Sequence, residues 1–467
     1  MSVQGTAPSP LLRGHSPVGG LDRRSLGPLP VLAQSVSAVA PTAAMATTPG
    51  LVRADTGVFA VWSVALATVL ALLVATCVRT FSRRMAAPGA LYSFTAKGLG
   101  PAAAFCCGCA LLIGYGVLAM GALTGSGLYA QQFLARLDLS LGPPQLTVAA
   151  VVLATGTLVA YFLLRGVRLS AGLTLCLEAA SILLALTFFV VLLVRHGARP
   201  DMRQLTPPTS ALGPVMAGAL PAFAAFIGFE SAAALGAETR RPFLTVGRAV
   251  RWTVVCSAAL FLLAVYAQVL PTAGSTSVRL PALLDLGVSL SFFACALASG
   301  TALVRLLFSM GRERMTPHRL GRTHPTHRTP HIAVALVLPV LVLVPLALIA
   351  AGTAPHVLFA RLVNLCVYGF LTAYALVCLA APVFLHRIGE LTHGPVAVAV
   401  LCVPSLLAVL LAHAATGGAL IPSLFVALMA AGTAWFLWMS RRDPASVGAI
   451  GVYDETSAAD VFPGPPR

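Results

Sequence analysis

Two acidic residues lie inside long apolar stretches of this sequence. Glu178 is part of "LTLCLEAASILLALTFFV", and Glu230 follows Gly228 and Phe229 in "FAAFIGFESAAALGAETRRP". A charge at the centre of a bilayer costs ~3 kcal/mol or more, so such residues usually face an interior cavity or a partner. A carboxylate avoids this cost when it binds a proton. We therefore interpret Glu178 and Glu230 as candidate residues for proton coupling.

Both carboxylates also have structural interpretations. Glu230 is placed to cap a half-helix that begins after Gly228, because a carboxylate is favoured at a helix N-terminus. Glu178 is able to hydrogen-bond to Ser or Thr on a neighbouring helix. These roles stay open beside proton binding. Arg305 lies near the end of its apolar stretch, so we expect its guanidinium to extend to the interface and assign it no function.

The composition places these carboxylates in a membrane. Of 467 residues, 58% are hydrophobic and 9% are charged, whereas ~25% are charged in an average soluble protein. Apolar runs of about 20 residues are long enough to cross a hydrocarbon core of ~30 Å as helices. We predict an all-α polytopic membrane protein with about twelve transmembrane helices. The predicted spans are 30–50, 57–78, 102–130, 145–164, 171–194, 212–236, 251–271, 287–308, 331–352, 357–385, 396–413 and 419–440.

Basic residues are unevenly distributed between the predicted loops. They gather in alternate loops, as with Arg79, Arg83 and Arg84, and the opposite loops hold fewer, with one exception at 195–203. The positive-inside bias predicts an even number of spans with both termini in the cytosol, and the plasma membrane is the default location. Basic loops beside an anionic leaflet explain the net charge of +16, so we expect no nucleic-acid partner.

The two ends of the chain differ in composition from its centre. Residues 1–28 and 441–467 are rich in Pro, Gly, Ser and Ala, which predicts disordered cytosolic tails. Residues 29–440 form one predicted membrane domain. No glycine-rich phosphate loop, HExxH or GxSxG motif occurs, so we predict no enzymatic activity and no cofactor. The ten cysteines lie in or at the ends of apolar spans and are interpreted as packing residues, not as metal ligands.

Two predicted spans are interrupted. Pro41 breaks the first span, and Pro221 and Gly228 interrupt the sixth. Backbone groups freed from a helix are tolerated in a bilayer only inside protein or beside a wet cavity. Half-helix N-termini then offer N–H groups to an anion, and free carbonyls suit a cation. An amino acid carries both charges, and spans one and six are equivalent if the core consists of two five-helix repeats.

Three segments resemble the amino acid permeases of the amino acid–polyamine–organocation (APC) superfamily. "FAAFIGFESAAALGAETRRP", residues 223–242, is similar to the sixth-helix signature of that superfamily. "APGALYSFTAKGLGP", residues 87–101, resembles the segment that leads into its third helix. "RLLFSMGRERMTPHRLGRTHPTHRTPHIAV", residues 305–334, is similar to its loop after the eighth helix. With all three in the expected places, the resemblance spans residues 29–440.

The resemblance implies a LeuT/APC-type core of two inverted five-helix repeats with two further helices. Substrate would bind at the breaks of helices one and six. The residues that this implies are Thr42, Ala43 and Ala44 for the carboxylate, and Phe226, Ile227 and Phe229 for the ammonium, with Gly228 at the break and Phe229 as a lid. The first break reads Pro-Thr-Ala-Ala, where the superfamily often has Gly-Ser-Gly, and alanine resists a positive φ. The geometry of the carboxylate site therefore stays open.

The sequence thus predicts a secondary transporter of amino acids or related amines, coupled to protons by symport. Its expected partners are the small-molecule substrate, protons and the lipid bilayer. Glu178 lies on the fifth predicted span, where members of the superfamily can place an ionisable residue beside the first break. Two alternatives stay open. One is an exchanger without ion coupling, and the other is a nutrient sensor with the same fold that does not transport.

Overall fold

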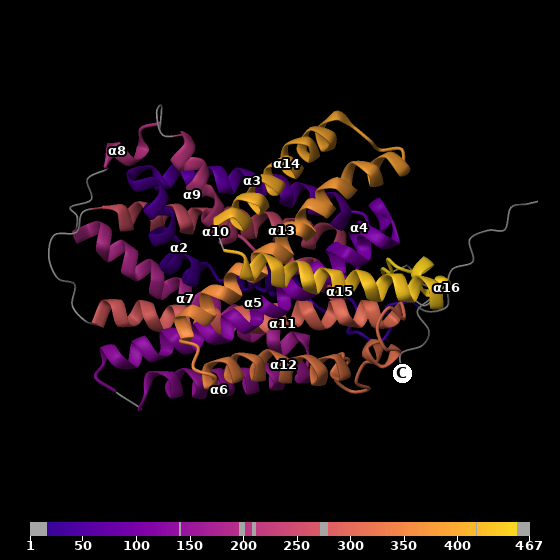
Figure 1. The fold of residues 1–467 in the computed structure, drawn as a ribbon, viewed down its shortest axis with the longest axis horizontal. Helices are drawn as coiled ribbons and strands as arrows, with labels where there is room; N and C mark the ends of the chain where they lie inside the picture. Colours follow the sequence, from indigo (N-terminus) through magenta and orange to yellow (C-terminus); the bar gives the residue numbers. More distant parts are fainter. Residues whose placement is uncertain are drawn as a thin grey trace, which may run out of the picture.

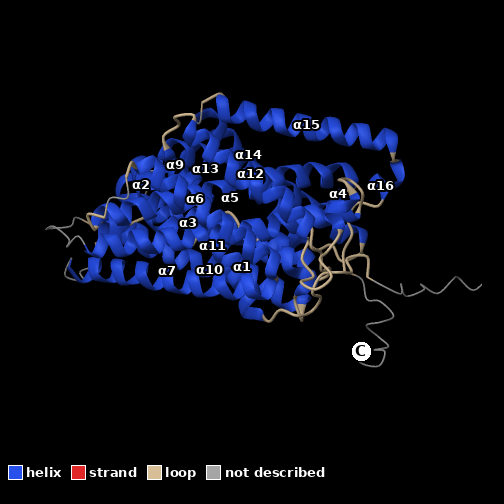
Figure 2. Cartoon of the chain, turned by 90° about the horizontal axis from the view of Figure 1, so that it is seen from below, coloured by secondary structure: helices blue, strands red, loops and turns tan. Residues whose placement is uncertain are grey.

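The computed structural model describes residues 16–139, 142–195, 201–207, 212–270, 279–416 and 418–454. These residues form a bundle of helices, most of which run along the long axis of the molecule (Figure 1), and no β-strand occurs among them (Figure 2). The helices are α1 (Pro28–Val39), α2 (Pro41–Thr56), α3 (Ala60–Ser82), α4 (Leu91–Leu99), α5 (Pro101–Arg136), α6 (Pro144–Arg165), α7 (Val167–Arg195), α8 (Met202–Leu205), α9 (Leu212–Ala224), α10 (Pro242–Val269), α11 (Arg279–Arg312), α12 (His331–Ala350), α13 (Pro355–Arg387), α14 (His393–Thr416), α15 (Leu420–Arg442) and α16 (Pro444–Gly448). Three short 3-10 helices join them: η1 (Gly57–Phe59), η2 (Ser231–Glu238) and η3 (His318–Gly321).

Within the described residues, ten helical segments are long and apolar enough to cross a membrane by length and composition. The first of these, Pro28–Ser82, contains α1, α2 and α3, which the sequence divides into two predicted spans. The predicted sixth span corresponds to α9 and η2, and α9 alone is shorter than the ten. The helical character of the predicted spans is confirmed, whereas the exact number of crossings stays a prediction.

Small residues allow the central helices α5 and α13 to touch along their backbones. A Cβ added at Gly369 of α13 would lie 2.4 Å from the carbonyl oxygen of Ala110 and 2.8 Å from the amide of Gly114, both in α5. Helices in membranes associate through such small residues, which bring their backbones together. By contrast, α14 and α15 bury little of their surface, and Figure 2 shows α15 along one edge of the bundle. The core is built around α5, α11 and α13, which are the most buried of the ten segments.

The N-terminal and C-terminal segments of the described chain meet on one face. The carboxylate of Asp454 pairs with Arg23 at 2.7 Å and accepts a hydrogen bond from the Ser16 hydroxyl at 2.6 Å. The amide of Asp454 donates to the carbonyl of Ala86 at 2.6 Å. A chain whose two ends lie on the same face crosses a membrane an even number of times. This contact supports the even number that the distribution of basic residues predicts.

Glu313, directly after α11, holds the C-terminal segment in place. Its carboxylate accepts hydrogen bonds from the amides of Gly451 at 2.8 Å and Val452 at 2.7 Å, and from the Tyr92 hydroxyl. Burial raises the pKa of Glu313 to about 7, although these hydrogen bonds oppose the rise. The ionised carboxylate of Glu313 has enough lone pairs to accept all three of these hydrogen bonds.

The described parts of both tails are ordered, which differs from the prediction of disorder for 1–28 and 441–467. Val18 and Leu21 are buried together with Phe308 of α11, and Val452 packs against the same cluster. The composition of the tails predicts disorder because they contain few apolar residues. In the structure, these apolar side chains and the buried carboxylate of Glu313 hold the described tail residues against the bundle. Residues 1–15 and 455–467 lie outside the described residues.

Candidate functional site

The first break separates α1 from α2 at a single residue. Ala40 adopts φ 52° and ψ 61°, and its amide donates to the carbonyls of Val36 and Ser37, both at 3.1 Å. Pro41 then begins α2. Proline is tolerated at the first position of a helix, because a backbone N–H at that position has no acceptor inside the helix. A left-handed conformation is uncommon for residues other than glycine, so the neighbouring helices must hold it.

The three residues predicted to bind a carboxylate form the first turn of α2. Thr42, Ala43 and Ala44 are all buried. Amides in the first turn of a helix usually have no partner inside it, and they lie at the positive end of the helix dipole. Ala44 is an exception here, because its amide donates to the carbonyl of Ala40 at 3.0 Å. The anion-binding capacity of this turn therefore rests on Thr42 and Ala43.

The second break lies in the turn residues 225–230, between α9 and η2. Gly228 has φ +101°, which only glycine adopts readily. The carbonyl of Phe226 accepts a hydrogen bond from the amide of Phe229 at 3.4 Å. The carbonyls of Ile227 and Phe229 accept none from the residues that the structure describes. Unpaired carbonyls at a helix break suit a cation, as the sequence predicts for this segment.

The two breaks lie against each other. A Cβ added at Gly228 would lie 2.8 Å from both the carbonyl carbon and the carbonyl oxygen of Ala38, in the last turn of α1. The amide of Ala232 in η2 donates to the Ser35 hydroxyl at 2.8 Å. The Cys295 thiol of α11 donates to the carbonyl of Ala38 at 3.3 Å. Glycine is therefore required at 228 both for its conformation and for this close backbone approach.

Glu230 is a hydrogen-bonding centre beside the second break. Its carboxylate accepts from the Tyr115 hydroxyl of α5 at 2.6 Å and from the Tyr374 hydroxyl of α13. Tyr374 in turn accepts from the Gly228 amide at 3.2 Å, and its ring lies 5.2 Å from that of Phe229. The Glu230 side chain makes no capping hydrogen bond to η2. Glu230 is the residue at the N-cap of η2, as the sequence predicts, but its carboxylate binds Tyr115 and Tyr374 and so links the break to α5 and α13.

Glu178 of α7 lies beside the first break. Its Oε1 atom accepts hydrogen bonds from the Ser291 hydroxyl of α11 at 3.0 Å and the Ser181 hydroxyl at 3.4 Å. The Thr42 hydroxyl donates to Ser181 at 3.3 Å, and the Thr42 backbone amide also interacts with the Glu178 carboxylate. The Oε2 atom of Glu178 is buried without a hydrogen-bond partner. This oxygen is available for a proton.

A buried ion pair joins η2 to α11. The Arg305 guanidinium donates to both carboxylate oxygens of Glu238, from Nε at 2.6 Å and from Nη2 at 2.8 Å. Both side chains are almost fully buried, with 4% and 1% exposed. Arg305 therefore does not extend to the interface, and that expectation from the sequence is wrong. The charge of the guanidinium is neutralised by Glu238 inside the protein, because the planar guanidinium group donates two parallel hydrogen bonds to one carboxylate.

Residues 24–26 of the N-terminal segment bind the same end of η2. The amides of Ser25 and Leu26 donate to the carbonyl of Glu238 at 2.7 and 2.8 Å, and the amide of Arg24 donates to the carbonyl of Ala237 at 3.2 Å. The carbonyl of Leu26 accepts from the amide of Arg240 at 3.0 Å. The N-terminal segment, η2 and α11 thus form one hydrogen-bonded unit on the face where the tails meet.

Removal of one partner of the buried ion pair is expected to destabilise the protein strongly. Glu238→Gln leaves the Arg305 charge buried without a counter-charge, which costs ~3–5 kcal/mol. The matched control is Glu390→Gln, which breaks the exposed pair with Arg84 and is expected to cost under ~1 kcal/mol. The Tm of each purified variant measures the difference. Equal Tm values for the two variants would contradict a stabilising role of the buried pair.

Sequence reasoning found Glu178, Glu230 and the two breaks, but it missed the side chains that bind them. In the sequence, Tyr115 and Tyr374 are ordinary residues of apolar spans, and no local pattern indicates that they bind a carboxylate. The sequence did contain an indication that Arg305 has a buried partner. A charge inside an apolar run is costly without one, as it is for Glu178. The two candidate carboxyls share no hydrogen-bond partner: Glu178 accepts from Ser181 and from Ser291 of α11, whereas Glu230 accepts from Tyr115 of α5 and Tyr374 of α13.

The chain is similar in sequence to known proteins. A family model described as "Amino acid permease" matches residues 26–390, which include both breaks and the buried ion pair. The branched-chain amino acid permease BcaP of Bacillus subtilis (strain 168) is 25% identical over 347 residues, which are 68% of this chain and 71% of that protein. A methylthioribose transporter of the same strain is 25% identical over 356 residues, which are 70% of this chain and 73% of that protein.

Solved structures share the arrangement of helices. Crystal structures of mutant forms of the Eremococcus coleocola manganese transporter match with a TM-score of 0.50. The match covers 90% of this chain and 94% of that chain, at 13% sequence identity. At this identity the likeness concerns the fold alone.

Proposed function

The chain belongs to the amino acid permease family, and on that premise we propose that it is a secondary active transporter of amino acids or related amines in the plasma membrane. The observation that carries the proposal is the contact between the two helix breaks at Gly228 and Ala38. Ala38 lies in the last turn of α1, four residues before Thr42, and Gly228 lies in the turn that holds the unpaired carbonyls of Ile227 and Phe229. An anion site beside a cation site fits the carboxylate and ammonium of an amino acid.

The APC-type fold predicted from the sequence motifs is confirmed by the family match and by the likeness to a solved transporter. The family match also confirms the prediction of a multi-pass membrane permease. We do not carry manganese over to this chain, because the structural likeness concerns the fold alone. Among the described residues, no group of three or more His, Cys, Asp or Glu is placed to hold a metal ion.

Coupling to protons is part of the proposal, and Glu178 supports it. The carboxyl is buried beside the first turn of α2 and has one oxygen without a partner. Proton binding there removes the cost of a buried charge, so protonation and the position of α2 are linked. An exchanger without coupling and a non-transporting sensor are the alternatives. Both would keep the same fold and breaks.

One observation favours a second candidate substrate class. The Glu178 carboxylate lies beside the first turn of α2, joined to the Thr42 hydroxyl through Ser181, and so already places an acidic group where a substrate carboxylate would bind. A solute without a carboxylate would bring no second negative charge beside Glu178. One relative is named for methylthioribose, a ribose derivative, and the other for branched-chain amino acids. The substrate test therefore includes both types of solute.

The proposal is tested in two steps. A thermal-shift panel of amino acids, polyamines and methylthioribose identifies ligands, because a ligand stabilises the state that binds it. Proteoliposomes then measure uptake of the best ligand with an inward proton gradient, without it, and with a protonophore. Accumulation that the protonophore abolishes is expected for symport. Exchange that is insensitive to it indicates an exchanger, and binding without uptake indicates a sensor.

Both termini are expected in the cytosol. The pairing of Asp454 with Arg23 puts the two ends on one face, and the basic loops favour the cytosolic side for it. A fluorescent reporter that matures only in the cytosol, fused after residue 467, should therefore be bright in whole cells. An impermeant thiol reagent should fail to label a cysteine introduced at the C-terminus. Labelling of that cysteine from outside would contradict the proposed orientation.

A further inference from the structure

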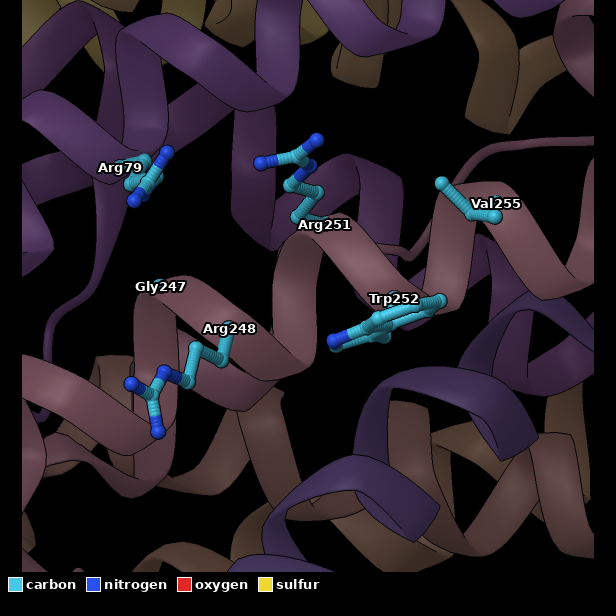
Figure 3. A pocket seen from close by; sticks show the side chains of 6 residues that line it. All are labelled: Arg79, Gly247, Arg248, Arg251, Trp252 and Val255. Atoms are coloured by element: carbon cyan, nitrogen blue, oxygen red, sulfur yellow. The ribbon is translucent and has the colours of Figure 1, made fainter.

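A pocket of about 330 Å³ lies between the end of α3 and the first turns of α10 (Figure 3). Its lining residues are Arg79 of α3 and Gly247, Arg248, Arg251, Trp252 and Val255 of α10. Its volume falls at the lower end of the range for small-molecule sites, about 300–1,000 Å³. A Cβ added at Gly247 would lie 3.0 Å from the Cγ atom of Arg79. Glycine at this position thus allows the Arg79 stem to lie against α10.

The pocket carries three positive charges without a counter-charge. Among the described residues, no acidic side chain forms an ion pair with Arg79, Arg248 or Arg251. The charges of Arg83, Arg251 and Arg248 all act on Arg79. Figure 3 shows Arg79 and Arg251 on one side of α10, the Arg248 guanidinium directed to the opposite side, and the Trp252 indole further along the helix. Like charges gathered in this way create a field that attracts an anion.

The pocket opens onto the apolar outer surface of α10. Trp252 is 57% exposed and Val255 is 36% exposed, and Phe243 and Leu244 in the first turn of α10 are also exposed. In the proposed topology this end of α10 lies at the cytosolic interface. Tryptophan is enriched at this depth, and arginine extends its guanidinium toward lipid headgroups there. The anions on the lipid side of this end of α10 are phospholipid headgroups, which carry acyl chains.

We propose that this pocket binds the phosphate group of an anionic phospholipid of the cytosolic leaflet. Arg79 and Arg251 hold the phosphate, because guanidinium groups pair with its oxygens through parallel hydrogen bonds, and Arg248 adds positive charge to the pocket. Trp252 and Val255 contact the first part of an acyl chain. The bound lipid joins α3 to α10 and thereby stabilises the helix bundle. The site shares no residue with either helix break and does not depend on which solute is transported.

A soluble phosphate has the same headgroup chemistry, but the surroundings of the pocket favour the lipid. A soluble anion gains nothing from the exposed Trp252 and Val255, whereas an acyl chain covers both. The cytosolic leaflet also supplies anionic lipid at high local concentration beside basic residues. The experiment therefore compares phosphatidylglycerol, phosphatidylcholine and inorganic phosphate on the same protein.

The test measures the Tm of the purified full-length protein in detergent as each of these three ligands is added. Phosphatidylglycerol is expected to raise the Tm of the unmodified protein by at least about 2 °C, with little change from phosphatidylcholine or inorganic phosphate. The double variant Arg248→Gln/Arg251→Gln is expected to lose most of this rise. The matched control, Arg240→Gln/Arg241→Gln, removes the same charge from exposed residues just before α10 and should keep the rise.

The outcomes separate the site from general attraction to a basic surface. An equal loss of the phosphatidylglycerol effect in both double variants would overturn the proposal, because the effect would then depend on net charge alone. If inorganic phosphate raised the Tm by the same amount as phosphatidylglycerol, the proposal that the pocket binds a lipid would be wrong. If the pocket variant is too unstable for comparison, Trp252→Ala keeps all three charges. It should weaken the response to phosphatidylglycerol and leave the Tm in phosphatidylcholine unchanged; a full response would also count against the site.

Discussion

Glu178→Gln is expected to abolish accumulation of substrate against its gradient while exchange of substrate across the membrane continues. The amide resembles the protonated carboxyl and cannot release a proton, so net proton movement stops. Its oxygen still accepts the hydrogen bond that Ser291 donates to Oε1 at 3.0 Å, so the surroundings of the break are kept. In proteoliposomes with an inward proton gradient, the ratio of internal to external substrate should fall to about one. Counterflow of labelled substrate should persist.

Glu230→Gln is the matched control for this experiment. Both residues are buried glutamates in apolar segments, but Glu230 receives two tyrosine hydroxyls and has no unpaired oxygen. An amide still accepts one of these bonds, so gradient-driven uptake should fall only in part. Accumulation by Glu178→Gln at the level of the unmodified protein would contradict its coupling role. Glu230 would then be the next candidate.

Gly228→Leu is expected to abolish substrate binding. Its φ of +101° disfavours any side chain, at a cost of ~1–3 kcal/mol. The added Cβ would also lie 2.8 Å from the backbone of Ala38, which has no freedom to rotate away. Separation of the two breaks would misplace the amides of α2 relative to the carbonyls of the second break. The ligand-induced rise in Tm should disappear.

Gly172→Leu provides the control, because nothing lies within 4 Å of a Cβ added at Gly172 in α7. This variant should bind and transport normally. Both variants should reach the membrane in similar amounts, which gel filtration of solubilised protein measures. Gly228→Ala is a smaller change for use if the leucine variant fails to fold, and it meets the same backbone contact. Normal uptake by Gly228→Ala would contradict the position of Gly228 at the substrate site.

The sequence predicted the spans and the two breaks because each depends on local properties. A span requires only a run of apolar residues. The first break lies at Ala40, directly before Pro41, and the second contains Gly228. The conformation of the first break was not predictable. Ala40 takes a positive φ that alanine disfavours, and only the packing of neighbouring helices fixes it.

The partners of the candidate carboxyls could not be predicted, because they come from distant parts of the chain. Ser291 is separated from Glu178 by 113 positions, and Tyr115 from Glu230 by 115. Many serines and tyrosines satisfy the chemistry equally well, so a sequence without its fold cannot select among them. The error at Arg305 has the same origin. Its distance from the end of a span suggested an interfacial position, whereas Glu238, 67 positions away, neutralises it inside the protein.

The hydrogen bonds between residues 24–26 and η2 link the displacement of η2 to the release of this N-terminal segment. Three backbone hydrogen bonds join this segment to Ala237 and Glu238, at the end of the second broken helix. Displacement of η2 must carry the segment with it or break these bonds. Linkage is reciprocal, so whatever captures the released segment favours the displaced η2 to the same extent that displacement favours release. If substrate binding at the proposed site displaces η2, the accessibility of the N-terminal segment would change with it, and a soluble ligand of that segment would in turn change the affinity for substrate.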